Sequence, residues 1–312
     1  MVHNYYQRRG GEDEQAEQDA RLLERFGHPV RLYSRHNDEI KEFSAWRKGL
    51  LFLEPTWSTR TYREISQLIR TFKPDVVHVH NFFPLITPSV FYACTHHHVP
   101  TVFTLHDYRL LCPIGWFFRK GAICEECVTH SLFRGIRYGC YHHSSLQTAS
   151  ITLLLKTHQL LKTWQNKVDL YIALTSFSRQ KFIQAGIPDA KIFIRPNFII
   201  DDPISSNAQR NFAAFVGRLS EEKGLAVLVE AWKHLPSTPL KIIGDGPLRP
   251  WLEDYIAKNH MEQVELVGFL PLQEIFDYLR QALFLIMPSI WYETFGRTII
   301  EAFATGTPVI AS

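Results

Sequence analysis

The sequence predicts an α/β protein with two doubly wound domains, and three observations support this prediction. Short apolar runs alternate with segments of helical period over most of the chain, which is typical of a parallel sheet covered by helices on both faces. A polar segment near residues 196–211 interrupts the alternation, which then begins again. The 312 residues suffice for two domains of about 150 residues, each with its own core. We therefore expect a first domain over 1–196, a linker over 197–211 and a second domain over 212–312.

In the first domain, short apolar runs bounded by turn residues predict the strands. These runs are Pro29–Tyr33, Asp75–His80, Val99–Leu105, Val168–Leu174 and Lys191–Arg195, and Met1–His3 can supply one more. Apolar residues spaced by three or four predict two amphipathic helices, one through Ala16, Ala20, Leu23 and Phe26 and one through Tyr62, Ile65, Leu68, Ile69 and Phe72. A third helix is expected over Ser176–Ala185.

The second domain repeats this pattern. We expect strands at Phe212–Val216, Leu240–Ile243, Val264–Val267, Leu283–Met287 and Pro308–Ala311, with helices between them. Parallel strands present their carboxyl ends at one edge of the sheet, where doubly wound proteins bind ligands. Two such domains facing one another would leave a cleft, and we expect the functional residues to line it.

Composition excludes several classes of protein. The formal charge of +3, from 34 Lys and Arg against 31 Asp and Glu, is too near neutral for nucleic-acid binding driven by charge. The 46% apolar and 21% charged residues are an ordinary globular mixture. No apolar run approaches the roughly 18 residues that span a bilayer, and no apolar signal follows Met1. We expect a cytoplasmic protein with no nucleic-acid partner.

Two turns of the second domain are candidates for phosphate binding. The segment Phe215–Gly224 places Arg218 and Lys223 between a strand and a helix, where two cations and helix N–H groups suit a diphosphate. In the next such turn, Gly244 allows close approach of the backbone to a ligand. The alternatives are a solvated loop for the first turn and an ordinary strand-to-helix turn for the second.

A third segment, Pro288–Ala302, carries two carboxylates. Glu293 lies in the loop after a strand, and Glu301 lies in a helix that begins near Phe295 or Gly296. Apolar neighbours flank Glu301, so its carboxylate is expected on a buried face, where it needs hydrogen-bond donors. A ribose diol supplies two donors, and neighbouring backbone groups are the alternative.

Together with the pattern Ala-x-x-x-Gly-x-Pro-Val-Ile-Ala at 302–311, these motifs resemble the retaining glycosyltransferases of family 4. The resemblance runs from Met1 to Ser312 and implies the GT-B fold of two Rossmann-like domains, with a UDP-, GDP- or ADP-linked sugar bound mainly by the second. It implies that the first domain lies on the side of the acceptor, a glycan or a lipid-linked molecule of polysaccharide assembly. The implied donor contacts are Arg218 and Lys223 on the diphosphate, Glu301 on the ribose, Glu293 on the sugar, and the backbone of Phe295, Gly296 and Arg297 on the phosphates.

In the first domain, the resemblance assigns Gly10 and Gly11 to the glycine-rich loop that lines the cleft. It also matches His106 to the active-site histidine that contacts the transferred sugar. The alternatives are a simple turn and a structural histidine. The implied mechanism is attack on the same face of the sugar, with Arg218 and Lys223 stabilising the leaving diphosphate. The family does not require an Asp-x-Asp motif, so no catalytic metal is expected.

The segment from Asp107 to about Ser145 has no sustained period and is expected to be an insertion. It holds Cys112, Cys124, Cys127 and Cys140, separated by 11, 2 and 12 residues. These thiols are candidate ligands of a structural zinc ion, and free thiols or a redox pair are the alternatives.

Apolar residues beside Lys suggest peripheral contact with the inner face of a membrane. They occur in Trp116–Lys120, Leu153–Lys156 and Leu160–Lys162, and packing beneath the insertion is the alternative.

The resemblance also predicts that the sequence is truncated, because the family continues beyond the last strand through further helices. An inactive fragment or a non-catalytic nucleotide-sugar-binding protein is therefore the alternative to a transferase.

Overall fold

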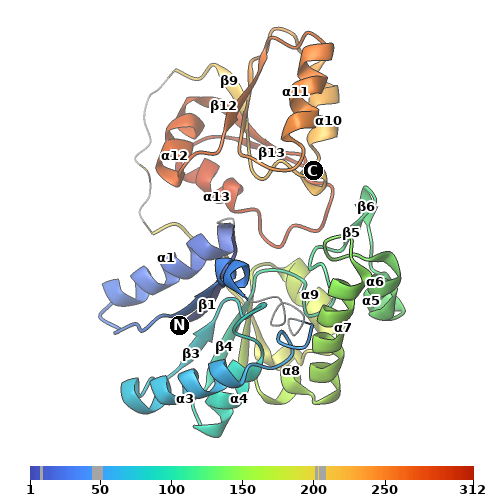
Figure 1. Cartoon of the computed structure of the whole chain (residues 1–312). Coiled ribbons are helices and arrows are strands. Elements are labelled where there is room, and N and C mark those ends of the chain that lie inside the picture. The colour runs from blue at the N-terminus through green and yellow to red at the C-terminus, as the bar shows by residue number, and fades with distance from the viewer. Residues whose placement is uncertain (8–9, 44–51, 201–202, 204–208) are drawn as a thin grey trace. The chain divides into compact units, whose positions relative to one another are not determined.

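The computed structural model describes residues 1–7, 10–43, 52–200, 203 and 209–312, which form two compact units (Figure 1). The first unit comprises Met1–Phe117 and Cys124–Asn197, and the second comprises Phe118–Ile123 and Phe198–Ser312. Part of the predicted linker over 197–211 lies outside the described residues, at 201–202 and 204–208. Each unit is built around a parallel sheet, which confirms the predicted fold class.

The sheet of the first unit has six parallel strands in the order β2-β1-β3-β4-β7-β8. Their bounds are β1 Val2–Tyr5, β2 Tyr33–His36, β3 Val77–Val79, β4 Thr101–Leu105, β7 Leu170–Ala173 and β8 Ile192–Ile194. Five of these strands overlap the predicted runs and are shorter or shifted by one or two residues, because the apolar pattern extends beyond the hydrogen-bonded ladder.

The strand predicted at Pro29–Tyr33 is wrong in position, since β2 begins at Tyr33. Pairing with β1 sets its register, in which Val2 faces Tyr33 and Tyr5 faces His36. Only Arg35 of β2 is buried, and its guanidinium pairs with Glu39 at 2.6 Å. An edge strand whose one buried residue is an arginine carries no apolar signal, whereas the preceding Leu32 is exposed.

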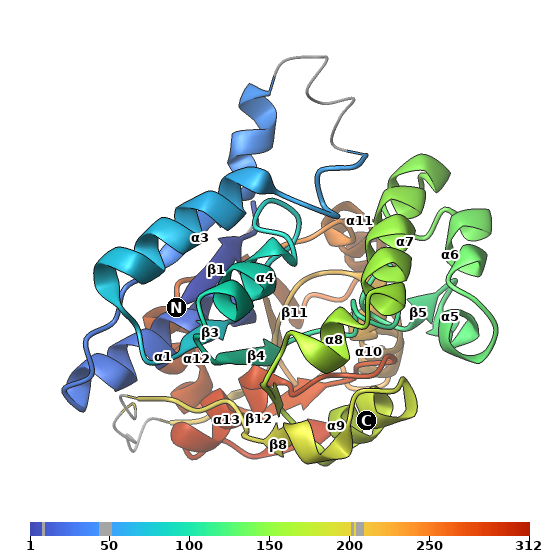
Figure 2. The same ribbon diagram turned by 90° about the horizontal axis from the view of Figure 1, so that it is seen from below.

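The helices of the first unit, in chain order, are α1 Gly11–Arg25, α3 Thr59–Phe72, α4 Ser89–His96, α5 Glu126–Thr129, α6 Phe133–Tyr138, α7 Ser145–Leu160, α8 Thr163–Asn166 and α9 Ser176–Gln184. Short 3-10 helices cover Asn37–Glu42 and Asp189–Lys191. In both views α3 lies beside α4 and α6 beside α7 (Figures 1 and 2). The predicted irregular segment holds α5, α6 and the hairpin of β5 (Phe118–Arg119) and β6 (Ala122–Ile123), and the first long helix after it begins at Ser145.

The face that α1 buries differs from the predicted one. Ala16 is buried as expected, but Leu23 and Phe26 are exposed. The other buried positions of α1 are polar, namely Asp13, Gln15, Gln18 and Asp19. Histidine and arginine side chains of the same unit receive this face, so polar pairing decides the orientation of the helix.

The second unit has a five-stranded parallel sheet in the order β11-β10-β9-β12-β13. The strands are β9 Phe212–Val216, β10 Leu240–Ile243, β11 Val264–Gly268, β12 Ala282–Met287 and β13 Val309–Ala311. Its helices are α10 Leu225–Trp232, α11 Arg249–Lys258, α12 Leu272–Gln281 and α13 Arg297–Ala304, with a 3-10 helix at Glu221–Lys223. All five strands confirm the prediction to within one residue at each end.

Helices cover both faces of this sheet, as the alternation along β9 shows. Ala213 and Phe215 pack in one core with α10 and α11, whereas the core on the other side holds Phe212, Ala214 and Val216 with residues of α12 and α13. Figure 1 shows α10 and α11 on one side of the sheet and α12 and α13 on the other. Burial on both faces explains why these strands appear in the sequence as continuous apolar runs.

Glycine allows the loops at the carboxyl edge of this sheet to contact one another through their backbones. A Cβ atom on Gly224 would lie 1.8 Å from the carbonyl oxygen of Pro288, and Gly224 has a φ of +70°. A Cβ atom on Gly244 would lie 1.9 Å from the carbonyl oxygen of Gly217. Neither position accepts a side chain, so these glycines hold the three motif loops together.

No helix in the described ranges is both long and apolar enough to cross a bilayer.

We expect Gly224→Ala to destabilise the protein more than Gly186→Ala does. Both glycines have positive φ, which costs another residue roughly 1–2 kcal/mol, but nothing lies within 4 Å of a Cβ on Gly186. The added clash at Gly224 should contribute about 1–3 kcal/mol more to the loss of unfolding free energy. Chemical denaturation measures both variants, and equal losses would contradict the proposed close contact.

Candidate active site

Lys223 and Glu293 meet at the carboxyl edge of the second sheet. Lys223 Nζ lies 2.5 Å from Glu293 Oε1, which also accepts a hydrogen bond from Ser289 Oγ at 2.8 Å. The ammonium group lies 5.0 Å from the centroid of the Trp291 ring. The backbone fixes this meeting, because the amide of Ile290 donates to the carbonyl of Glu222 at 3.0 Å. The structure therefore brings together two of the predicted site residues, 70 positions apart.

Arg218 is held by a pair that the sequence analysis missed. Its Nη2 donates to Glu222 Oε1 at 2.6 Å, and its Nε donates to Ser220 Oγ at 3.0 Å. Burial raises the pKa of Glu222, but the Arg218 charge and hydrogen bonds from Ser220 and Arg218 outweigh it and hold the pKa below its usual value. Glu222 is therefore a carboxylate at neutral pH, and it orients the guanidinium of Arg218.

Glu301 is buried, as predicted, with 5% of its surface exposed. Its carboxylate accepts a hydrogen bond from Nε of Arg297, one turn earlier on α13, at 3.3 Å. Gly296 precedes α13 with a φ of +76°, and Phe295 is half-buried before it. The structure thus places Glu301 and Arg218 in separate ion pairs of the second unit, apart from the Lys223–Glu293 pair.

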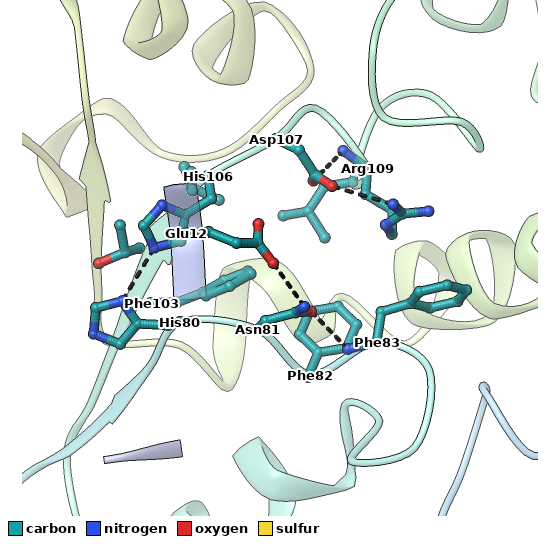
Figure 3. Close-up of a pocket in the computed structure, with 12 residues that line it drawn as sticks. Glu12, His80, Asn81, Phe82, Phe83, Phe103, His106, Asp107 and Arg109 are labelled. Carbon is teal, nitrogen blue, oxygen red and sulfur yellow. Dashed lines mark hydrogen bonds and ion pairs between the residues drawn. The ribbon is translucent and has the colours of Figure 1, made fainter. Parts of the chain in front are cut away.

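The first unit has a small pocket of about 20 Å³, the volume of roughly one water molecule, that His106 lines (Figure 3). Glu12, His80, Asn81, Asp107 and Arg109 line the same pocket. Nδ1 of His80 lies 3.0 Å from Nε2 of His106, and Nδ2 of Asn81 donates to Glu12 Oε1 at 2.8 Å. Asp107 accepts from the amide of Arg109 at 2.9 Å.

Glu12 is a site residue that the sequence analysis missed. Burial raises the pKa of Glu12 well above its usual value, and the charges of Asp107 and Asp13 raise it further, against an opposing effect of Arg109. Gly11 begins α1 and Gly10 caps it, with the Gly10 amide donating to Asp13 Oδ2 at 2.8 Å. Its place in the sequence could have indicated it, because a glutamate directly after Gly10 and Gly11 lies at the same edge of the unit as the glycine-rich loop.

His78 lies in β3, and His80, directly after the strand, places its ring beside that of His78. Nε2 of His78 lies 2.7 Å from Thr104 Oγ1, and the His78 and His80 ring centroids lie 4.1 Å apart. Burial lowers the pKa of His78 to about 4, with Asp19 opposing the shift and Arg195 adding to it. Burial also lowers the pKa of His80 well below its usual value. Both imidazoles are therefore neutral at pH 7.

The structure brings together part of the predicted cysteine set. The thiol of Cys127 hydrogen-bonds to Cys112, which lowers the pKa of Cys112 to about 6 and raises that of Cys127. Cys140 lies near enough to act on the charge of Cys127. Within the described ranges, however, the four sulfur atoms are not gathered at the mutual distances of metal ligands. The zinc site stays a prediction.

The predicted membrane-contact segments differ in exposure. Phe117 is fully buried and packs against Tyr108, whereas Leu160 and Leu161 are exposed at the end of α7, before Lys162. Leu154 and Leu155 are fully buried on the same helix. Membrane contact also stays a prediction, centred on Leu160–Lys162.

Comparison with known proteins shows the family of this chain. The model of "Glycosyltransferase Family 4" matches residues 10–202, more than half of the chain, and that of "Glycosyl transferases group 1" matches residues 198–312. The chain belongs to glycosyltransferase family 4. The sequence resemblance to this family is thereby confirmed.

Relatives of this family-4 chain include a 2-deoxystreptamine N-acetyl-D-glucosaminyltransferase of Niallia circulans, 23% identical over 86% of the chain. A glycogen synthase of Mycobacterium tuberculosis is 29% identical over 78% of the chain. The chain spans 66% and 53% of the lengths of these relatives. Among solved structures, Anabaena HepE in complex with UDP matches 99% of the chain and 80% of its own, at 19% identity and a TM-score of 0.61, which confirms the GT-B fold.

Acid should destabilise this family-4 chain through its neutral histidines. The unfolded chain takes up a proton on His78 below pH 6.5, whereas the folded chain does so only near pH 4. We therefore expect His78 to cost about 3 kcal/mol of unfolding free energy as the pH falls from 6.5 to 4. Denaturation at several pH values should show that the unfolding free energy falls less steeply with decreasing pH in His78→Gln than in the exposed control His28→Gln. Equal slopes would contradict the assignment.

The zinc prediction requires about one zinc ion per chain in the purified protein. Metal analysis of the wild type and of Cys127→Ser measures it, and the variant should lose the ion. A folded wild type with almost no zinc would contradict the site and leave the Cys112–Cys127 pair as free thiols.

Proposed function

We propose that this chain transfers a sugar, with retention of the anomeric configuration, from a nucleoside diphosphate sugar to a glycan or lipid-linked acceptor. Family membership supports the reaction class. The observation that carries the donor site is the contact of the turn at Glu222–Gly224 with the segment Pro288–Glu293, because it places a cation and a carboxylate together at the carboxyl edge of a parallel sheet. We assign the donor to the second unit and the acceptor to the first.

Lys223 and Arg218 are the proposed diphosphate ligands. Two cations in a strand-to-helix turn match a diphosphate in charge, and a planar guanidinium can donate two parallel hydrogen bonds to phosphate. The backbone amides at Phe295–Arg297 precede α13 and add donors of the type that helix N-termini offer to anions. Gly244 keeps the neighbouring turn free of a side chain.

Donor binding must then rearrange the Lys223–Glu293 pair. Lys223 Nζ has Glu293 as its partner in the structure, so a phosphate oxygen has to share or replace that carboxylate. Glu293 thereby becomes an acceptor for sugar hydroxyls, the contact proposed for it. Glu301, already buried against Arg297, is a carboxylate with about four acceptor sites, and in the complex two of these accept the ribose hydroxyls.

During transfer, negative charge grows on the leaving diphosphate while the sugar becomes cationic. Lys223 and Arg218 stabilise the leaving group, and fixed donors of this kind contribute about 10²–10³ in rate each. Because these side chains can supply the positive charge, the proposal needs no metal ion at the reacting phosphate. The leaving oxygen takes the proton of the acceptor hydroxyl on the same face of the sugar, which gives retention. His106 contacts the transferred sugar, and Gly10 and Gly11 leave space beside it.

A non-catalytic nucleotide-sugar-binding protein is the second candidate. Thermal shift with UDP, GDP, ADP and their sugars identifies the donor in either case, because binding stabilises the folded chain. NMR of the product then decides between the two. Transfer or hydrolysis with retained anomeric configuration supports the enzyme, whereas binding without turnover supports the alternative.

We expect Lys223→Ala to lower kcat/KM for sugar transfer by at least about 100-fold with folding intact. Lys258→Ala is the matched control, because Lys258 is exposed on α11 and pairs with Asp254, four residues earlier on the same helix. Initial rates with the donor found by thermal shift measure both variants. An unchanged rate in Lys223→Ala would contradict the donor site.

A further inference from the structure

A chain of four polar side chains runs through the first unit and ends at His106. Arg195, directly after β8, donates from Nη1 and Nη2 to the two carboxylate oxygens of Asp19 on α1, at 2.8 and 2.6 Å. Asp19 Oδ2 lies 3.4 Å from His80 Nε2, and His80 Nδ1 lies 3.0 Å from His106 Nε2. Figure 3 shows the His80–His106 end of this chain. Side chains from four segments of the sequence thus contact one another in series, and the series ends at the His106 imidazole.

The two central members are shielded from water. Asp19 is 3% exposed and His80 is 2% exposed. A buried polar group that lacks a partner costs free energy, so each member constrains the hydrogen-bonding state of the next. The His80 and His106 rings also stack, with centroids 5.3 Å apart and planes tilted by 23°.

These groups do not form a cation site, although ligand atoms of Asp19, His78 and His80 lie within 4.8 Å of one another. The guanidinium of Arg195 takes both oxygens of Asp19, and Nε2 of His78 lies 2.7 Å from Thr104 Oγ1. A metal ion would have to compete with the Arg195 guanidinium for both oxygens of Asp19. The arrangement instead suits a chain of polar contacts, in which His80 Nε2 faces the Asp19 carboxylate at 3.4 Å without a hydrogen bond.

The charge on Asp19 determines which nitrogen of each imidazole holds the proton. A carboxylate only accepts, so the proton of neutral His80 belongs on Nε2, which faces Asp19. At 3.4 Å this contact is long for a hydrogen bond, and it acts mainly through charge. Nδ1 of His80 is then an acceptor, and Nε2 of His106 must donate to it. His106 is left with its lone pair on Nδ1.

We propose that Asp19 and His80 are positioning residues that fix His106 as the tautomer with hydrogen on Nε2, so that Nδ1 accepts a hydrogen bond from a sugar hydroxyl. This inference rests on the proposed function, which places His106 against the transferred sugar. It explains why α1 buries Asp19 while Leu23 and Phe26 are exposed.

The tautomer can be read directly in the wild-type chain. Nitrogen NMR of the protein labelled with ¹⁵N-histidine, with signals assigned by single His→Gln variants, distinguishes protonated from unprotonated ring nitrogens. At pH 7 we expect His80 and His106 both to be protonated on Nε2 alone. Protonation of His106 on Nδ1 would overturn the inference, whether or not the chain shows activity.

Asp19→Asn should move the proton of His80, and then that of His106, to the other ring nitrogen. Oδ1 of Asp19 accepts two hydrogen bonds, from Arg195 Nη1 and from Gln15 Nε2 at 3.2 Å, whereas Oδ2 accepts one, from Arg195 Nη2. The amide oxygen of the variant therefore takes the place of Oδ1, and the hydrogen bond from Arg195 Nη2 is lost. The amide NH₂ then faces His80 Nε2 and forces the proton of His80 onto Nδ1. His106 must follow, and its Nδ1 becomes a donor. We expect kcat to fall by about 10–100-fold, the effect of losing one hydrogen bond to a buried partner, with KM changed less.

Asp13→Asn is the matched control. Asp13 lies on the same buried face of α1, and its carboxylate is 2.6 Å from His3 Nε2, outside the chain. A merely structural role of Asp19 predicts that both variants lose stability and activity alike with the His106 tautomer unchanged, and that result would overturn the inference. If the wild type shows no transfer, the proposed function fails. The histidine tautomers of the wild type and of Asp19→Asn still test whether Asp19 and His80 set the tautomer of His106.

Discussion

The second unit depends on backbone contact between loops, at positions where a side chain cannot fit. Gly224 lies against the carbonyl of Pro288 and Gly244 against the carbonyl of Gly217, so three strand-to-helix connections are stacked at one sheet edge. This backbone packing, with the hydrogen bond from the Ile290 amide to the Glu222 carbonyl, brings Lys223 and Glu293 together. The apolar cores on the two faces of the sheet stabilise the unit, and the close backbone contacts at the glycines define where the charged groups lie.

Most of the fold could be predicted from the sequence, because burial on both faces makes a strand a continuous apolar run. That holds for Phe212–Val216 and Leu240–Ile243, whose bounds agree fully with the prediction. It fails for β2, an edge strand that buries only Arg35, and for the orientation of α1, whose buried residues are mainly polar. Hydrophobic periodicity reports the apolar face of an element, and it gives the wrong face where ion pairs and imidazoles replace the core.

The candidate site likewise contains residues that the sequence predicted and partners that it did not. Lys223, Glu293, Glu301 and His106 belong to compact motifs, so the sequence points to each of them. The partners of Arg218 and Glu301, namely Glu222 and Arg297, are local, four residues away. His80 and Asp19 are polar residues whose pairing depends on distances that only the folded chain defines, such as that between Asp19 and Arg195, 176 positions apart in the sequence. Motifs predict the groups that act, whereas the groups that hold them in place follow from packing.

The pairing of Lys223 with Glu293 and of Arg218 with Glu222 has a consequence for selectivity among solutes. A cation that already faces a carboxylate attracts simple anions weakly, since chloride or inorganic orthophosphate must compete with a tethered partner at close range. A ligand that brings two linked phosphoryl groups, together with hydroxyls for the displaced acid, can compensate for breaking such a pair. In the proposed donor site, these pairs therefore weaken the binding of simple salts and favour a ligand that combines phosphoryl charge with hydroxyl groups.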